Sequence, residues 1–295
     1  MKKLAVQASI STAVLLIVIK AFASFLTGSL AILSSMADSL ADAVSSLITF
    51  IAVHYSNRPF NQSHRYGYGK LEALSALIQA AFIGGSAGFI AYDGIYRFIH
   101  PVTMDITFTG VLIMLISLLL TVSLVMFQNY VTKRVHSLAV TADSAHYKID
   151  IFSNLGVILS LLIVKYTDWQ WFDTVVALII ALYLLRNAWE IVTKALGEIT
   201  DCEIDDVTKK NILNQIKNIK EIKGCHDFRT RLSGNLLFIE LHLEMDGNLS
   251  LFEAHEITEL AEQKIIELYP QAQIIIHQDP SGIEEKRLDH QIDGL

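Results

Sequence analysis

The sequence predicts an α-helical membrane protein: a six-helix transmembrane bundle at about residues 1–197, followed by a small α+β domain at 198–295. Of the 295 residues, 52% are hydrophobic and only 18% are charged, whereas an average soluble protein carries roughly a quarter charged residues. Six stretches in the first part are apolar over the roughly 20 residues that a helix needs to cross a bilayer. The charge changes at the same boundary. Residues 1–197 hold 13 Lys/Arg and 10 Asp/Glu, whereas residues 198–295 hold 10 and 20.

The composition excludes several other classes of protein. Only 15 glycines and 4 prolines are present, too few for a collagen-like or disordered chain. The formal net charge of −7 argues against nucleic acid as a partner. Two cysteines, Cys202 and Cys225, cannot form a disulfide framework or an all-thiolate zinc site. We interpret Cys225 as a reduced free thiol rather than a ligand for a soft metal.

The six expected spans cover about residues 8–25, 30–53, 74–95, 106–127, 138–164 and 172–192. The first is not a cleaved signal peptide, because it lacks a clear small-residue cleavage site and five further spans follow it. Lys and Arg are enriched in cytoplasmic loops. With the N-terminus inside, the inner segments hold eight of them: Lys2, Lys3, Arg58, Arg65, Lys70, Lys133, Arg134 and Lys194. The outer segments hold only Arg97 and Lys165, so we expect both termini in the cytoplasm.

Residues 198–295 have the pattern of a compact domain with the order αββαβ. Apolar residues recur at three- and four-residue spacing over 205–216 and 251–268, which predicts two helices. Strand-like runs at 226–232 and 236–245 flank a Ser-Gly-Asn turn, as in a hairpin. A last apolar run at 272–277 is typical of a buried strand. We expect two helices on a three-stranded sheet, and a polar end from about residue 281.

Two of the expected spans carry candidate metal ligands. Asp38 and Asp42 are four residues apart in the second span, and His146 and Asp150 have the same spacing in the fifth. This spacing places each pair on one helix face. An ionised side chain at membrane depth costs at least about 2.5–3.5 kcal/mol. A divalent cation can offset that cost, because three carboxylates and one imidazole can bind it tetrahedrally.

Other interpretations apply to each residue taken alone. An isolated Asp in a span can cap a helix or form an interhelical hydrogen bond, and a single His is usually structural. The matching spacing of the two pairs favours the metal site. Small residues surround Asp38 and Asp42 over 34–46. They are consistent with close helix packing or with a hydrated path for the ion, and both interpretations stay open.

With six spans and a small α/β tail, the motifs Asp38-x-x-x-Asp42 and His146-x-x-x-Asp150 resemble the cation diffusion facilitator family, in particular its bacterial zinc and ferrous-iron efflux branch. The resemblance covers nearly the whole chain. It implies a homodimer in the bacterial inner membrane, with a metallochaperone-like cytoplasmic domain, that exports divalent metal in exchange for protons. It also implies that these four residues form the transport site.

The resemblance also points to metal sites outside the membrane. Relatives often carry an Asp and two His in the loop after the second span, where this chain has Asn61, His64 and Tyr68. Only His64 is a good ligand, so we expect a weak or missing site there. In the tail, the strings around His226 and His277 look like the family's intersubunit metal-binding segments. The candidate ligands are His226, His242, His255, His277 and Asp279; the alternative is that these histidines are solvated surface residues.

Two further residues match an interlocking salt bridge of the family. Lys70 precedes the third span and Asp201 follows the sixth. An exposed ion pair contributes only about 0–1 kcal/mol. We therefore expect its value to be geometric, in fixing the hinge of the dimer.

The expected mechanism is competition between metal and protons at one buried site, because carboxylates and neutral imidazole bind a cation only when deprotonated. His146 is the expected proton carrier, since an unperturbed imidazole has a pKa of about 6.5. The ligand set suits zinc, cadmium and ferrous iron, whereas manganese prefers all-oxygen ligands.

Three alternative functions remain to be considered. An intramembrane metalloenzyme lacks a recognisable His-Glu-x-x-His motif or acid–base pair. A membrane metal sensor would move no metal across a sealed vesicle. In a passive divalent-cation channel, a proton gradient would not drive metal flux against the metal gradient.

Overall fold

The computed structural model describes residues 1–27, 30–99, 108–167, 171–283, 287 and 289. Within the helices, it does not describe the side chains of residues 27, 30–35, 37, 38, 97, 108–111, 153, 157–167 and 171–173. The chain divides into two compact units, Met1–Leu196 and Gly197–Leu295.

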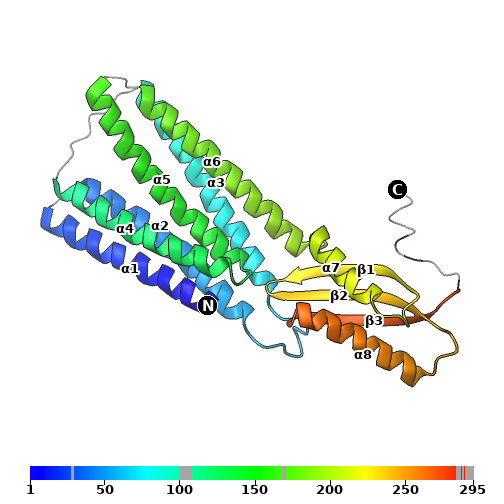
Figure 1. The fold of residues 1–295 in the computed structure, drawn as a ribbon. Helices are drawn as coiled ribbons and strands as arrows, with labels where there is room; N and C mark the ends of the chain where they lie inside the picture. The colour runs from blue at the N-terminus through cyan, green and yellow to red at the C-terminus, as the bar shows by residue number, and fades with distance from the viewer. Residues whose placement is uncertain (28–29, 100–107, 168–170, 284–286, 288, 290–295) are drawn as a thin grey trace. The chain divides into compact units, whose positions relative to one another are not determined.

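The first unit is a bundle of six long helices over its described residues (Figure 1). Their bounds are α1 Lys2–Thr27, α2 Leu30–Ser56, α3 Lys70–Ile99, α4 Phe108–Thr132, α5 Leu138–Thr167 and α6 Trp171–Ile199. Each helix includes nearly all of an expected span, and most run several residues past it. In the described residues, α1, α3, α4 and α6 are long and apolar enough to cross a membrane. Over their described residues, α2 and α5, which carry the predicted transport-site residues, do not meet that test.

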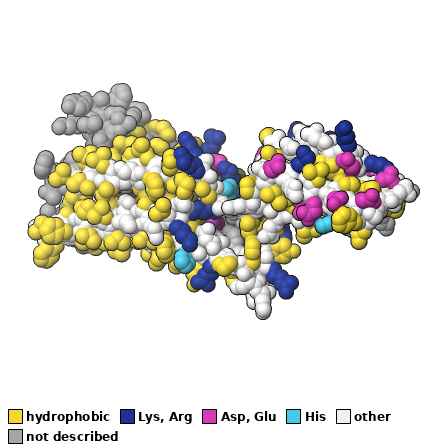
Figure 2. All heavy atoms as spheres, turned by 60° about the horizontal axis from the view of Figure 1, so that its bottom comes forward, with side chains coloured by type: hydrophobic (Ala, Val, Ile, Leu, Met, Phe, Trp, Pro, Cys, Tyr) yellow, Lys and Arg dark blue, Asp and Glu magenta, His cyan; other side chains and the backbone are white. Residues whose placement is uncertain are grey.

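The side chains of this unit are arranged for an apolar solvent. Large apolar residues such as Phe22, Leu119 and Leu182 are at least 60% exposed, and hydrophobic side chains cover most of the face seen in Figure 2. Serine, glutamine and carboxylate side chains are instead buried between the helices. Polar groups without water must find partners inside the protein, so the bundle holds its polar chemistry at its centre.

The second unit contains five elements in the predicted order. They are α7 Asp206–Lys217, β1 Gly224–Ser233, β2 Leu236–Met245, α8 Leu251–Leu268 and β3 Gln273–Pro280. The sheet order is β1-β2-β3. The hairpin strands β1 and β2 are antiparallel, and β3 lies parallel to β2 because α8 carries the chain back.

One face of this sheet forms the core of the second unit. Ile212 and Ile216 of α7 and Ile265 of α8 pack with Leu241 and Leu243 of β2. Side chains alternate along a strand, so His242 and its neighbours at even positions face the opposite side of the sheet. The start of each helix is fixed by a side chain: Asp205 caps α7, and Ser250 forms a capping box that opens α8.

Candidate metal centres

The helices α2 and α5 bring Asp42 and His146 together in the core of the bundle. The His146 Nε2 atom lies 2.9 Å from Asp42 Oδ1, and the two residues are 7% and 8% exposed. The other ring nitrogen of His146, Nδ1, is buried and has no hydrogen-bond partner among the described residues. Asp150 is half-buried one turn further along α5. Asp38 lies one turn before Asp42 on α2, and its side chain is outside the described residues.

The register of the sheet in the second unit creates a second cluster. His226 of β1 is paired with His242 of β2, and His242 is paired with His277 of β3. Neighbouring strands lie about 4.8 Å apart, so three imidazoles form a row across the sheet. The ring centroids of His226 and His242 are 5.0 Å apart, and those of His242 and His277 are 4.7 Å apart.

Asp279 completes this cluster from the end of β3. It lies two residues after His277 and therefore projects from the same face. Its Oδ2 atom is 2.8 Å from His242 Nδ1 and 3.5 Å from His226 Nε2. Ligand atoms of His226, His242 and Asp279 all lie within 4.8 Å of one another, close enough to hold a metal ion. His277 Nε2 is 3.1 Å from the other carboxylate oxygen.

The remaining predicted ligand of the tail, His255, lies on α8. Its side chain is 61% exposed, and its Nε2 atom is 3.9 Å from a carboxylate oxygen of Glu259 on the same helix. Within the single chain it is not part of the three-residue cluster. Its role as a metal ligand stays a prediction.

The sequence reasoning missed Glu244, which adjoins the cluster. Glu244 Oε1 is 3.2 Å from His226 Nδ1 and 2.6 Å from Arg287 Nη2. The residue lies two positions after His242 on β2, so the alternation of the strand already placed it on the metal-binding face. Cys225 packs against the hydrophobic core of the unit, and burial raises the pKa of its thiol to about 11.

The loop after α2 is organised by its own side chains. The ring of His64 stacks on that of Tyr68 with centroids 4.3 Å apart. The Asn61 side-chain amide donates a hydrogen bond to the Tyr68 hydroxyl at 2.7 Å, and its oxygen accepts from the His64 backbone amide. His64 is the only imidazole in this arrangement, as the sequence predicts.

The predicted interlock would pair Lys70 with Asp201. Lys70 is the first residue of α3. Asp201 follows α6 in a left-handed conformation with a φ of 58°, and its carboxylate lies 3.6 Å from Arg231 Nη1. The Lys70–Asp201 pair stays a prediction.

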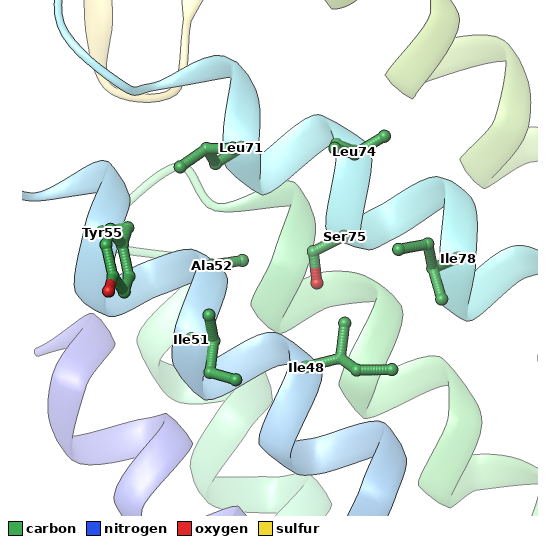
Figure 3. Close-up of a pocket in the computed structure, with 8 residues that line it drawn as sticks. All are labelled: Ile48, Ile51, Ala52, Tyr55, Leu71, Leu74, Ser75 and Ile78. Atoms are coloured by element: carbon green, nitrogen blue, oxygen red, sulfur yellow. The ribbon is translucent and has the colours of Figure 1, made fainter.

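A pocket of about 400 Å³ lies between α2 and α3, and it is not a metal site. Apart from Ser75 and the Tyr55 hydroxyl, the side chains in Figure 3 are aliphatic; they are Ile48, Ile51, Ala52, Leu71, Leu74 and Ile78. None of the predicted metal ligands lines this pocket, so the candidate ion chemistry lies elsewhere.

Both units match known family domains. The domain described as "Cation efflux transmembrane domain" matches residues 6–200, and "Cation efflux protein, cytoplasmic domain" matches residues 204–281. Together with the helical bundle and the small sheet, these matches define an integral membrane transporter of cations, not an enzyme. The chain belongs to the cation efflux, or cation diffusion facilitator, family. The predicted family and fold class are therefore confirmed.

Several relatives cover almost the whole chain. The "Cation-efflux pump FieF" of Shewanella oneidensis is 40% identical over 282 residues, which are 96% of this chain and 95% of the relative. The protein of the same name from Klebsiella pneumoniae is also 40% identical, over 91% and 89%. Among solved structures, the "Metal-bound C-terminal domain of CzcD transporter from Thermotoga maritima" is 24% identical with a TM-score of 0.26, over 28% of this chain and 100% of that one.

Proposed function

We propose that this protein is a proton-coupled antiporter that exports divalent metal cations from the cytoplasm. Zinc is the proposed principal substrate, with ferrous iron and cadmium also accepted. The observation that carries the proposal is the buried contact between His146 Nε2 and Asp42 Oδ1 at 2.9 Å, inside a domain of the cation efflux family. An imidazole and carboxylates that meet at membrane depth need a cation or a proton to offset their desolvation.

The proposed transport site has four ligands: Asp38, Asp42, His146 and Asp150. One nitrogen and three oxygens form a donor set that suits tetrahedral zinc. Manganese is disfavoured, because it prefers oxygen ligands alone.

Protons are the proposed counter-substrate. The contact between His146 and Asp42 is short enough for the two groups to share a proton, and a metal ion bound there would displace it. A site that opens first to the cytoplasm and then to a more acidic exterior would release metal and take up protons. His146 is the proposed proton carrier, because its intrinsic pKa of about 6.5 is closest to the working range.

The remaining features follow from this assignment. We propose an inner-membrane location in a bacterium with both termini in the cytoplasm, based on the Lys/Arg distribution. The cytoplasmic domain would join two copies of the chain and bind metal at His226, His242 and Asp279, with His277 and His255 as additional ligands. Resident metal in this domain would be zinc or a similar ion, held by two or more imidazoles and a carboxylate.

Vesicle transport tests the proposal directly. Purified full-length protein is sealed into vesicles with a zinc-sensitive dye inside, and a pH gradient is imposed. We expect zinc uptake against its own gradient in the wild type and its loss in Asp42→Asn and His146→Ala. The matched control is His54→Ala, an exposed histidine on α2, which should transport normally.

Each contrary result favours a different rival. Zinc flux that ignores the pH gradient would indicate a passive channel, and no flux at all would indicate a metal sensor. Undiminished uptake by both Asp42→Asn and His146→Ala would reject the assigned site.

A further inference from the structure

A buried network of hydrogen bonds lies beside the Asp42–His146 pair. At its centre is Asp143 of α5, which is completely buried. Asp143 Oδ2 accepts hydrogen bonds from Ser9 Oγ of α1 at 2.7 Å and from Gln128 Nε2 of α4 at 2.6 Å. Its Oδ1 atom lies 3.4 Å from Ser46 Oγ of α2. One carboxylate therefore connects α5 to three other helices.

The network lies one helical turn from the proposed transport site on both α2 and α5. Ser46 lies one turn after Asp42 on α2, and Asp143 lies about one turn before His146 on α5. The same two helices are therefore joined at two successive turns, once by Asp42 and His146 and once by Ser46 and Asp143. If Asp143 moves along the axis of α5, His146 moves with it.

Tyr147 adds a second connection between these turns. Its side chain is completely buried, and its hydroxyl lies 2.8 Å from Ser46 Oγ. Its ring meets that of His146 edge-on, with centroids 6.0 Å apart. The serine pair closes the network, since Ser9 Oγ and Ser46 Oγ are 2.7 Å apart. Buried networks of this kind restrict the packing of the elements that they join.

We propose that Asp143 is a positioning residue for metal transport: it holds α5 against α1, α2 and α4 so that His146 stays opposite Asp42. The inference rests on the proposed function of the Asp42–His146 site. A ligand that is held in place before the ion arrives binds it more tightly. Mutation of the groups that orient metal ligands typically lowers metal affinity by about 10- to 100-fold. Asp143 touches no ion in this scheme and acts through His146.

A second buried network supplies a matched control. Gln79 of α3 is also completely buried. Its side chain bonds the Ser45 carbonyl at 2.8 Å and Thr49 Oγ1 at 2.9 Å, both on α2. It thus joins α2 to α3 with a similar number of polar contacts. Gln79→Ala tests whether any loss of a buried polar contact changes transport.

The experiment measures the KM for zinc in the vesicle assay, together with the melting temperature of each purified variant. For Asp143→Asn we expect a KM raised about tenfold or more, with a smaller change in the rate at saturating zinc. Gln79→Ala should lower the melting temperature to a similar extent and leave the KM within about twofold of the wild type. Gln128→Ala, which removes one donor to Asp143, should raise the KM about threefold, as expected for one hydrogen bond.

Two results would overturn the positioning role: a wild-type KM in folded Asp143→Asn, or an equal rise in KM in Gln79→Ala. If Asp143→Asn does not fold, the KM of Gln128→Ala decides the matter in the same way. Asp42→Asn separates the two proposals. Loss of transport in Asp42→Asn, with a normal KM in Asp143→Asn, would reject the positioning role alone. Normal transport by both variants would reject the transport site as well.

Discussion

The residue with the largest share of the proposed chemistry is His146. Its Nε2 atom meets a carboxylate, while Nδ1 is buried and finds no hydrogen-bond partner in the described part of the chain. In an apolar interior, an unsatisfied polar atom is costly, and a histidine kept only for packing gains little from that position. The proposed metal site would account for an imidazole rather than a leucine at this turn of α5.

His146→Asp should broaden the metal selectivity. The change replaces the one nitrogen ligand of the proposed site with an oxygen ligand, and all-oxygen sites favour manganese more than mixed sites do. We expect manganese to compete with zinc uptake in this variant at concentrations at which it has no effect on the wild type. Competition assays in vesicles measure this directly. An unchanged manganese inhibition curve would show that the nitrogen ligand does not set selectivity.

At the scale of elements, four helices have an end near Glu72 of α3. Its Oε1 atom lies 2.7 Å from Lys2 Nζ at the start of α1 and 3.0 Å from Ser56 Oγ at the end of α2. Its Oε2 atom accepts from Ser137 Oγ, just before α5. Lys2 and Glu72 are 6% and 2% exposed, so this ion pair is buried, and its carboxylate also accepts hydrogen bonds from the two serines.

Glu72→Gln should destabilise the bundle strongly. Removing one partner of a buried ion pair typically costs about 3–5 kcal/mol, because the other charge stays buried without compensation. We expect a clearly lower melting temperature for the purified protein in detergent. The control is Glu190→Gln, which removes an exposed pair with Lys194 and should cost less than about 0.5 kcal/mol. Equal melting temperatures for the two variants would refute a stabilising role for the buried pair.

Periodicity and spacing account for the elements but not for the contacts between them. The sequence predicted β2 and α8 with their observed bounds, because apolar alternation and helical spacing are local properties. It also placed Asp42 and His146 in facing spans. It could not supply the hydrogen bond between Ser9 and Asp143, which are 134 positions apart. Contacts of this kind depend on how the helices pack against one another, and the residue spacing within one helix does not predict that packing.

In the histidine cluster of the second unit, the sequence likewise predicts the residues but not the contacts between them. The sequence identified the histidines and Asp279 as candidates. The row of three imidazoles depends on strand register, since a shift of one residue would move His242 to the core face. Register is set by the hairpin turn and by the apolar face of each strand. It could be read only once the pairing of the strands in the sheet was known.

On the scale of the whole molecule, the two units differ in net charge as well as in the polarity of their exposed surfaces. Residues 198–295 carry twice as many acidic as basic residues. An acidic surface raises the local concentration of divalent cations. The acidic charge of the second unit is therefore consistent with the metal-binding role proposed for its histidine row.

Zinc should stabilise this unit through the row, and removing the metal should reverse the effect. A ligand that binds only the folded state at 100 times its Kd adds about 2.7 kcal/mol. We expect a chelator to lower the melting temperature of zinc-loaded full-length protein, with a smaller effect in His242→Ala and Asp279→Asn because those variants lose cluster ligands. Glu240→Gln is the control, since Glu240 lies two residues before His242 on β2 and pairs instead with Arg229. A chelator effect as large in His242→Ala and Asp279→Asn as in the control would place the stabilising zinc outside the sheet.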